Sequence, residues 1–378
     1  MKGNMRFCVP CLFGVEGLVA QELRDMGLEQ VQAENGRVLF SGGWEAMVRA
    51  NLCGRFGERV LLLLGEFPAR SFEELFQGVK ALPWEGLLGK EDAFPVTGSS
   101  LSSQLHSVPD CQAIIKKAIV ERLKAKYKLS WFAESGALHR VRFRILKDQV
   151  SVMVDTSGEG LHKRGYRALS NDAPMKETLA ASLCQLSRLR QDGHLIDPFC
   201  GSGTILIEGA LLARNIAPGL GRAFTAESWG SVPGQLWQQE RERARSLERR
   251  DTGFTAQGFD VDPAAVELTL ANAQKAGVED CITASVRDVR DFTQEGPYGC
   301  VVCNPPYGER LLDVRQAQEL YRALGQVFQP RRGWSLGVIS PDPEFESLFG
   351  RKADKRRKLY NGMIQCQYYQ YFRGSDKR

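Results

Sequence analysis

Short apolar runs alternate with segments of helical periodicity from about Leu179 to Ser340, and this alternation constrains the fold more than any other feature of the 378-residue sequence. Strands and helices in alternation are typical of a doubly wound parallel sheet with helices on both faces. We therefore predict an α/β structure here, with strands at His194–Asp197, Gln257–Asp260, Ile282–Val286, Cys300–Cys303 and Ser335–Ser340.

The C-terminal end departs from this pattern. Lys355–Tyr360 and Met363–Phe372 are strand-like and flank the pair Asn361-Gly362, which predicts a β-hairpin. A parallel sheet closed by a C-terminal hairpin is an organisation of methyltransferases rather than dehydrogenases. The expected fold of this half is a Rossmann-like class I methyltransferase domain.

The N-terminal half predicts an α+β region of the ferredoxin-like kind, in two successive segments. Within Val31–Phe40 the pair Asn35-Gly36 indicates a hairpin. The first segment predicts strands at 7–12, 31–40 and 59–65 and helices at 17–26 and 44–52. The second predicts helices at 72–81 and 109–127 and strands at 93–97, 139–146 and 149–155.

Basic residues cluster in three places, although the net charge of +5 is mild. Arg140, Arg142 and Arg144 alternate with apolar residues, which predicts a strand with one basic face. Six lysines and arginines lie between 116 and 128, and 351–358 holds six basic residues in eight. A basic sheet face beside a basic helix suits binding to an RNA backbone, but a solvated face explains each cluster equally well.

The ten cysteines include two C-x-x-C pairs, Cys8 with Cys11 and Cys300 with Cys303, which together could hold a zinc ion. Because the second pair lies in an apolar run and Pro10 interrupts the first, we favour buried, reduced thiols and predict no metal site. Reduced thiols indicate a cytoplasmic protein. The longest apolar run, Val60–Leu64, is far too short to span a bilayer, so no membrane association is expected.

The turn after the first strand of the α/β region is the first candidate site. Asp197-Pro-Phe-Cys-Gly-Ser-Gly-Thr204 ends a strand, passes through two glycines and starts a helix, an arrangement that lets a ligand approach the backbone. A P-loop requires a lysine that is missing, and a dinucleotide fingerprint requires glycine where Leu206 stands. The remaining interpretation is a loop for the methionine part of S-adenosylmethionine, with candidate ligands at Asp197, Phe199, Gly201, Ser202, Gly203 and Thr204.

Acidic residues follow the next two strands. Asp260 is placed to accept the ribose hydroxyls of an adenosine, and Asp262 is the alternative, although Asp262 also suits the N-cap of a helix that starts at Pro263. Asp288 is placed to accept a hydrogen bond from the adenine amino group, unless it is an ordinary loop aspartate.

The most specific motif is the loop Asn304-Pro305-Pro306-Tyr307, which follows an apolar strand. The Asn304 side-chain oxygen and the Pro305 carbonyl can together accept both hydrogens of an exocyclic amine and direct its lone pair at the sulfonium methyl. Tyr307 can stack on a flipped base. The four residues are the predicted catalytic loop, and Asn304 also counts among the cofactor ligands.

These motifs are similar to those of bacterial THUMP-domain RNA methyltransferases, above all the 23S rRNA guanine-N2 methyltransferase group (RlmL/YpsC-like), some of whose members carry the name N6-adenine-specific DNA methylase. The similarity covers nearly the whole chain. The stretches that carry it are Cys11–Leu18, Asp155–Arg167, Ala173–Ala180, Ile216–Leu220 and Asn304–Leu311.

The resemblance implies a ferredoxin-like domain at 1–68, a THUMP RNA-binding domain at 69–155, a linker at 156–172 and an S-adenosylmethionine-dependent methyltransferase domain at 173–378. It implies that Lys176 and Thr178 contact the cofactor, and that methyl is transferred to N2 of a guanosine in 23S rRNA or in a ribosomal assembly intermediate. Larger relatives carry a second methyltransferase domain, whose activity is not expected because this sequence stops at Arg378.

The residues alone leave other functions open. Asn-Pro-Pro-Tyr also serves adenine N6, cytosine N4 and the glutamine amide of protein substrates, the last opposed by the expected RNA-binding region. The alternatives are an adenine-N6 methyltransferase acting on RNA or DNA, a guanine-N2 methyltransferase acting on tRNA, and a non-catalytic RNA-binding assembly factor. Intact motifs argue against the last. The sequence does not indicate an oligomeric state.

Overall fold

The computed structural model describes residues 4–167, 175–307, 314–328 and 332–372. The chain packs into two compact units, and each unit is assembled from separate stretches of the sequence. The first unit holds Met1–Cys11, Val19–Leu161 and Ala223–Glu242, and the second holds Leu12–Leu18, His162–Arg222 and Arg243–Arg378. The domain ranges given above follow sequence order, and they stay predictions.

A seven-stranded sheet forms the centre of the first unit, in the order β2-β3-β1-β4-β7-β6-β5. Neighbouring strands are antiparallel except β5 and β6, which are parallel. Because β4 pairs with both β1 and β7, one sheet runs through both N-terminal segments. The strands are β1 (Met5–Pro10), β2 (Glu29–Glu34), β3 (Arg37–Gly42), β4 (Leu61–Pro68), β5 (Val96–Leu101), β6 (Val141–Leu146) and β7 (Gln149–Asp155).

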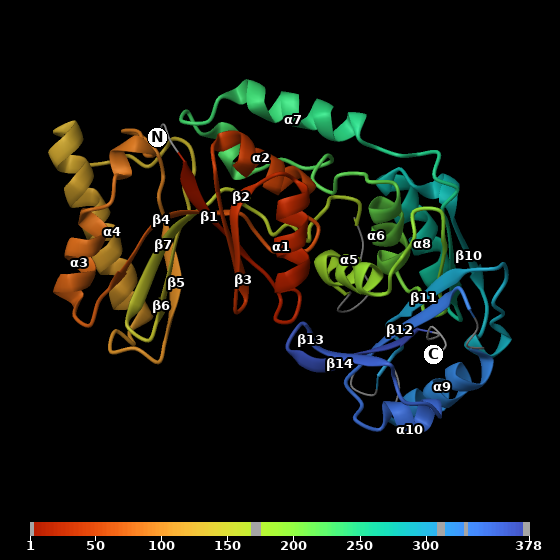
Figure 1. Ribbon diagram of the computed structural model, residues 1–378. Helices are drawn as coiled ribbons and strands as arrows, with labels where there is room; N and C mark the ends of the chain where they lie inside the picture. The colour runs from red at the N-terminus through yellow and green to blue at the C-terminus, as the bar shows by residue number, and fades with distance from the viewer. Residues whose placement is uncertain (1–3, 168–174, 308–313, 329–331, 373–378) are drawn as a thin grey trace. The chain divides into compact units, whose positions relative to one another are not determined.

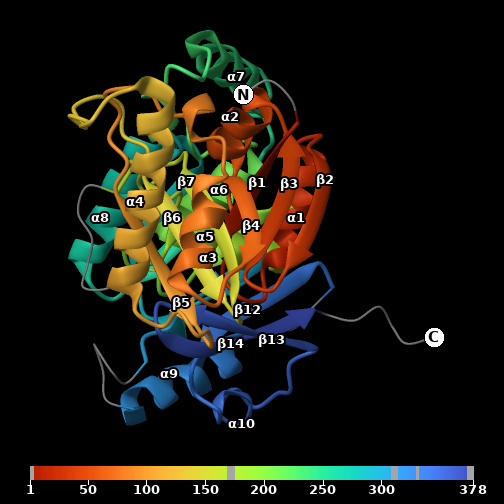
Figure 2. The ribbon, with the colours of Figure 1, turned by 90° about the vertical axis from the view of Figure 1, so that its left-hand side faces the viewer.

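The predicted helices of this half are confirmed, and α3 and α4 pack side by side against the sheet (Figure 1 and Figure 2). Ser71 starts α3 with a capping box, in which its hydroxyl accepts from the Glu74 backbone and the Glu74 carboxylate accepts from the Ser71 backbone. One predicted strand was displaced, because Ala93 forms only an isolated bridge to Leu138 and the strand begins at Val96. The helices are α1 (Glu16–Asp25), α2 (Trp44–Cys53), α3 (Phe72–Lys80), α4 (Val108–Tyr127) and the short η1 (Trp84–Gly86).

Several of the clustered basic residues are neutralised inside the first unit. Lys116 pairs with Glu134 at 2.5 Å and lies 3.6 Å from the centre of the Phe94 ring. Arg122 forms two hydrogen bonds with Glu85, at 2.9 and 2.6 Å. The alternation of β6 is confirmed, with its valine, phenylalanine and isoleucine buried and its arginines partly exposed. The surface is therefore less basic than the sequence alone indicates.

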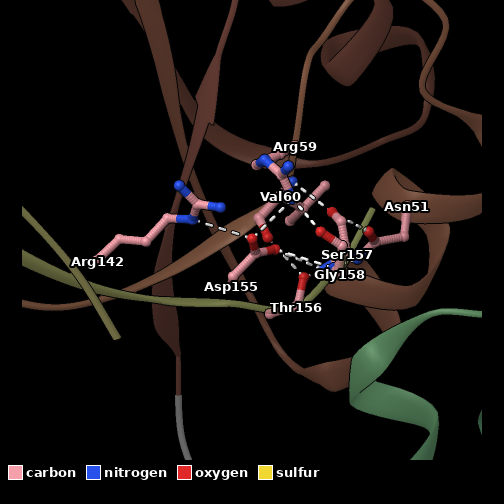
Figure 3. A network of polar contacts seen from close by, with 8 residues as sticks. All are labelled: Asn51, Arg59, Val60, Arg142, Asp155, Thr156, Ser157 and Gly158. Atoms are coloured by element: carbon pink, nitrogen blue, oxygen red, sulfur yellow. Dashed lines mark hydrogen bonds and ion pairs between the residues drawn. The ribbon is translucent and has the colours of Figure 1, made fainter. Parts of the chain in front are cut away.

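A buried carboxylate joins the end of β7 to its surroundings (Figure 3). Asp155 is fully buried, and its Oδ2 accepts from Arg59 at 2.8 Å and from Arg142 at 3.0 Å. Its Oδ1 accepts from the backbone nitrogens of Ser157 at 3.0 Å and Gly158 at 3.1 Å. A buried charge is tolerated only when it is paired and hydrogen-bonded, and here both oxygens have two donors.

The same network continues through side chains of α2 and the residues after β7 (Figure 3). The Asn51 amide donates to Thr156 Oγ1 at 2.9 Å and accepts from the Ser157 hydroxyl at 2.6 Å. Both hydroxyls also bond the backbone of Val60, with Thr156 donating to its oxygen and Ser157 accepting from its nitrogen. The start of the Asp155–Arg167 stretch is thus fixed within the first unit.

The segment Ala223–Glu242 belongs to the first unit although it lies far along the chain. The Trp229 indole stacks on the buried His139 ring at 4.4 Å and donates to the Leu138 carbonyl at 2.9 Å. The Glu240 carboxylate, nearly fully buried, accepts from Arg49 at 2.8 and 3.1 Å. The charged helix α7 (Gly234–Ser246) therefore does not present all its charges to solvent.

A second seven-stranded sheet, in the order β10-β9-β8-β11-β12-β14-β13, forms the centre of the second unit. Its first five strands are parallel, and β14 and β13 close it as an antiparallel hairpin, as predicted. The turn lies one residue later than predicted, at Gly362-Met363, because Asn361 still pairs with Ile364. The fold is therefore an α/β methyltransferase-type sheet with a C-terminal hairpin. The strands are β8 (His194–Asp197), β9 (Thr255–Asp260), β10 (Ile282–Val286), β11 (Gly299–Cys303), β12 (Trp334–Ser340), β13 (Lys355–Asn361) and β14 (Ile364–Phe372).

Helices cover both faces of this sheet, with α5, α6 and α8 on one side and α9 and α10 on the other (Figure 1). Burial on both faces accounts for the continuous apolar runs of the parallel strands. Within the described part of the chain, no helix has both the length and the apolar character needed to cross a bilayer. The helices are α5 (Glu177–Leu186), α6 (Thr204–Ala213), α8 (Pro263–Ala276), α9 (Val314–Val327) and α10 (Phe345–Phe349), with short turns η3 (Glu279–Cys281) and η4 (Val289–Asp291). The short turn η2 (Thr225–Ser228) belongs to the first unit.

We predict that Asp155→Ala destabilises the first unit by about 3–5 kcal/mol, because it leaves two arginines without their buried partner. Urea unfolding monitored by tryptophan fluorescence would measure the change. Glu29→Ala, which removes an exposed carboxylate from β2, is the matched control and should change stability by less than about 0.5 kcal/mol. Equal effects of the two substitutions would contradict the importance of the network.

Candidate active site

The predicted site residues meet at one edge of the second sheet. Strands β10, β9, β8 and β11 are parallel neighbours, so their carboxyl ends lie at the same edge. Helices that follow β8 and β9 cover one face, and the helix that follows β11 covers the other, so the strand order reverses between β8 and β11. Open α/β sheets bind their ligands at such a switch point. Asp197 ends β8 and Asn304 follows β11, one on each side of it.

A hydrogen bond joins the loops after the neighbouring strands β8 and β9. The backbone nitrogen of Gly201 donates to Asp260 Oδ2 at 3.0 Å, and the nitrogen of Asp262 donates to Oδ1 at 3.0 Å. Each carboxylate oxygen carries a second lone pair, so Asp260 can still accept two hydroxyl groups. Asp262 caps α8 by accepting from Ala264 at 2.9 Å, which confirms the capping alternative for this residue.

The two motif glycines have different roles. Both have positive φ, +51° at Gly201 and +78° at Gly203. A Cβ on Gly201 would meet no atom within 4 Å, whereas a Cβ on Gly203 would lie 2.8 Å from the Thr269 methyl group of α8. Gly201 therefore leaves open space beside the loop. Gly203 is required for packing against α8, and its contact with the cofactor stays a prediction.

Helix α8 supports the glycine loop from behind, through contacts that the sequence did not predict. The Thr269 hydroxyl donates to the Gly201 carbonyl at 2.9 Å, and the Asn272 amide donates to the Ser202 carbonyl at 3.0 Å. With its carbonyls engaged on this side, the loop holds a fixed shape. Polar residues at 269 and 272, three positions apart on the buried face of a helix, were the available signal.

Asp197 lies inside the turn and is almost fully buried. Its Oδ1 accepts from the Phe199 backbone nitrogen at 3.0 Å, while the Phe199 ring packs against the apolar core of the sheet. Burial raises the pKa of Asp197 to about 8, and the nearby Asp260 carboxylate adds to the shift. The observed role of Asp197 is to hold the turn, and its contact with a cofactor stays a prediction.

A second buried network anchors the helix that follows the loop. Glu208 of α6 accepts from Arg164 at 3.2 and 3.3 Å and from the Tyr166 hydroxyl at 3.1 Å. Arg167 then reaches the start of the same helix and donates to Thr204 Oγ1 at 2.7 Å. Thr204 in turn lies 3.2 Å from the Ser202 hydroxyl. The end of the Asp155–Arg167 stretch is thus tied to the candidate cofactor loop, which sequence reasoning missed.

The other predicted cofactor ligands lie at the start of α5 and after β10. Lys176 precedes α5, and Thr178 in its first turn is fully buried. Asp288 caps η4 by accepting from the Arg290 nitrogen at 2.8 Å, and its other oxygen pairs with the Arg290 guanidinium at 2.9 Å. As at Asp260, lone pairs remain for a ligand.

The Asn-Pro-Pro-Tyr loop carries an unsatisfied acceptor. Asn304 Oδ1 is buried, and no donor in the described residues lies within hydrogen-bond distance of it. Pro305 beside it is also buried. The Tyr307 hydroxyl accepts from the Asn361 amide at 2.6 Å, so the last residue of β13 holds the loop. Buried acceptors without a donor are rare in folded proteins and often belong to functional sites.

The residues present fit S-adenosylmethionine. Gly201 leaves a cradle that a Cβ would fill, and Asp260 offers carboxylate lone pairs directly beside it. Asn304 Oδ1 lacks a donor that an amine substrate can supply. None of the ten cysteines forms a disulfide, and Cys300 and Cys303 are buried in β11.

Three family models match the chain in succession. The RlmL ferredoxin-like domain matches residues 6–61, and the THUMP domain matches residues 69–155. The RMKL-like methyltransferase domain matches residues 164–370. Together the matches extend over most of the chain.

Known proteins are similar along its length. A Bacillus subtilis protein, YpsC, which is named as a candidate RNA methyltransferase, is 44% identical over 361 residues, covering 95% of this chain and 94% of its own. The ribosomal RNA large subunit methyltransferase K/L of Psychromonas ingrahamii is 35% identical over 99% of this chain, which spans 51% of that relative. The solved structure of SMU.472, a candidate methyltransferase complexed with SAH, is 42% identical with a TM-score of 0.93 and covers 100% of both chains.

We predict that alanine at Gly201 mainly weakens ligand binding, whereas alanine at Gly203 mainly lowers the stability of the fold. Gly201→Ala should weaken S-adenosylhomocysteine binding at least about tenfold, because the methyl group enters the open cradle, with a stability loss of about 1 kcal/mol for the positive φ. Gly203→Ala should lower the melting temperature more, because its methyl group meets Thr269. Isothermal calorimetry and thermal unfolding measure the two effects. If both variants lost S-adenosylhomocysteine affinity equally and had equal melting temperatures, the different roles assigned to the two glycines would be contradicted.

The raised pKa of Asp197 predicts a pH dependence of stability. The folded state holds the proton more tightly than the unfolded state, so the contribution of this group is complete below about pH 4 and is lost as pH rises towards 8. Asp197→Asn keeps an acceptor for Phe199 and cannot ionise. Relative to wild type, its melting temperature should therefore rise between pH 5 and pH 8.5. A constant difference between the two proteins across this range would contradict the pKa assignment.

Proposed function

Because this chain belongs to the RlmL-like family of THUMP-domain RNA methyltransferases, we propose that it transfers a methyl group to N2 of a guanosine in 23S ribosomal RNA. The chain is an S-adenosylmethionine-dependent RNA methyltransferase. The proposal specifies the base that is methylated, the atom of that base and the RNA that contains it. It is supported by the name of the K/L relative, a large-subunit ribosomal RNA methyltransferase, which this chain matches over 99% of its length.

When bound, S-adenosylmethionine supplies an electrophilic methyl group on a sulfonium. The loop around Gly201 would hold its methionine part, Asp260 its ribose hydroxyls and Asp288 its adenine amino group. Lys176, Thr178 and the residues Asp197–Thr204 surround this position. Every contact here is a proposal, supported by the placement of these residues at one sheet edge.

The single observation that carries the chemistry is the buried Asn304 Oδ1 without a donor. In our proposal, this oxygen and the Pro305 carbonyl accept the two N–H groups of the guanine amine, which directs its lone pair at the methyl group. The N–CH₃ bond forms as the S–CH₃ bond breaks, and the amine then loses a proton to solvent. Tyr307, held by Asn361, would stack on the base.

The N-terminal unit would bind the RNA. Residues 69–155 match the THUMP domain, and Arg144 on the partly exposed face of β6 has no carboxylate partner among the described residues. Ten cysteines without a disulfide support a cytoplasmic location, where ribosomes are assembled. Naked 23S rRNA and an assembly intermediate are both compatible with this arrangement.

Labelled S-adenosylmethionine offered with unmodified 23S rRNA transcript, tRNA and duplex DNA tests the proposal. Nucleoside digestion should yield N2-methylguanosine from the rRNA alone. N6-methyladenosine, or label in DNA or tRNA, would instead support the adenine or tRNA alternatives. If the protein binds RNA and S-adenosylhomocysteine but labels none of the substrates, an assembly intermediate is tested next, and its failure would leave the non-catalytic function.

We predict that Asn304→Ala lowers turnover at least about 100-fold while S-adenosylhomocysteine affinity stays within about threefold, because positioning of the amine is lost. Asn304→Asp retains an acceptor oxygen and should keep more activity than the alanine variant. Steady-state kinetics with the methylated RNA identified above would measure both. Wild-type turnover in Asn304→Ala would remove this residue from the mechanism.

A further inference from the structure

The C-terminal hairpin of the second unit carries exposed lysines on its outer strand, β13. β13 is the last strand of its sheet, and Lys355 and Lys358 on it are exposed. Neither lysine has a carboxylate partner among the described residues, whereas the neighbouring Arg356 pairs with Glu346 at 2.7 Å. Exposed lysines protect an edge strand from pairing with other chains. Because side chains of a strand alternate between its two faces, Lys355 and Lys358 flank the edge from opposite faces, and this positive charge suits a phosphate backbone that follows the edge.

This edge leads directly to the catalytic loop. Asn361, the last residue of β13, donates to the Tyr307 hydroxyl at 2.6 Å. The hairpin tip therefore lies next to the loop that would hold the target base. Any RNA following the strand towards Asn304 passes this tip.

The tip carries an exposed apolar side chain. Met363 is 96% exposed, more than any other large hydrophobic residue in the described part of the chain. Asn361 pairs with Ile364, so Gly362 and Met363 form a two-residue turn, and Gly362 has a φ of +64°. Glycine at the first of two turn positions is typical of a tight hairpin turn, so Met363 projects from a rigid support.

We propose that this hairpin docks the RNA, with Lys355 and Lys358 on phosphates and Met363 inserted into the base stack beside the target nucleotide. The proposal rests on the proposed function, because it assumes an RNA base at Asn304. A base in a helix must leave its stack to reach a catalytic pocket, and apolar side chains that insert between bases compensate for part of the lost stacking. Met363 is flexible and apolar, as such an insertion requires.

The phosphate contacts are tested by salt dependence. Binding of unmodified 23S rRNA transcript is measured between 50 and 200 mM potassium chloride for Lys355→Ala, Lys358→Ala and the control Lys275→Ala, an exposed lysine of α8. Each of the first two should reduce the slope of log K against log salt by about 0.7–0.9, and the control should not. Slopes equal to wild type for both variants would overturn the docking surface.

The insertion is tested by changing Met363. Met363→Ala should lower methyl transfer to a paired target nucleotide at least about tenfold, with RNA and S-adenosylhomocysteine affinities unchanged, and Met363→Leu should restore it. The defect should shrink when the nucleotide opposite the target is changed so that the target is unpaired. Leu247→Ala, which truncates another exposed apolar residue, is the control. Full activity of Met363→Ala on the paired target, or an equal defect on both targets, would overturn the insertion.

A third measurement separates this proposal from the function on which it rests. A short RNA stem with 2-aminopurine beside a guanine should brighten when wild-type protein binds, and Met363→Ala should bind without this change. The salt slopes and the fluorescence need no methyl transfer. If wild type labels no RNA yet both signals depend on the hairpin, the proposed function fails and the docking surface stands. No brightening with wild type would overturn the insertion alone.

Discussion

The hydrogen bond from the Gly201 backbone to Asp260 is the contact on which the candidate site depends. It joins the loops after β8 and β9, which are neighbouring parallel strands of the sheet. Asp260 also receives the Asp262 nitrogen, and Asp262 caps α8. The Thr269 hydroxyl of α8 then donates to the Gly201 carbonyl, so that hydrogen bonds connect the loop after β8, the loop after β9 and α8 in a closed ring. The shape of the loop is therefore fixed by protein atoms alone, before any ligand binds.

This ring of hydrogen bonds also determines which side of the loop after β8 is open to a ligand. The carbonyls of Gly201 and Ser202 are engaged by α8, so the open side is the one where a Gly201 Cβ would meet no atom. The loop leads directly into the start of α6, where the helix dipole favours a negatively charged group. The carboxylate of an amino-acid moiety satisfies this requirement.

The sequence was sufficient for the fold, because buried parallel strands are continuous apolar runs and the C-terminal hairpin has its own turn signal. It also located the ends of β8, β9, β10 and β11. It failed where the outcome depended on tertiary contacts. Ala93 belongs to no strand because only a single bridge to Leu138 forms there. The contact between Asn361 and Tyr307 joins residues 54 positions apart, and no local pattern encodes it.

Charge was the property that the sequence misjudged most. Lys116 and Arg122 looked like part of a basic helix face, yet each has an acidic partner in space that lies far away in sequence. Pairing of this kind removes a cation from the surface without changing the net charge of +5. Clusters of basic residues therefore identify a nucleic-acid surface only after the internal pairs have been removed from the count.

The stretch Asp155–Arg167, which carries part of the family resemblance, shows that a shared motif need not be catalytic. Its first residue, Asp155, is buried in the first unit and receives four hydrogen bonds there. Arg164 is buried near its other end and pairs with Glu208 in the second unit. Removing one partner of a buried pair leaves an uncompensated charge, so neither end tolerates substitution easily. The need for a carboxylate at Asp155 and a guanidinium at Arg164 therefore restricts the sequence of this stretch, whether or not it touches a substrate.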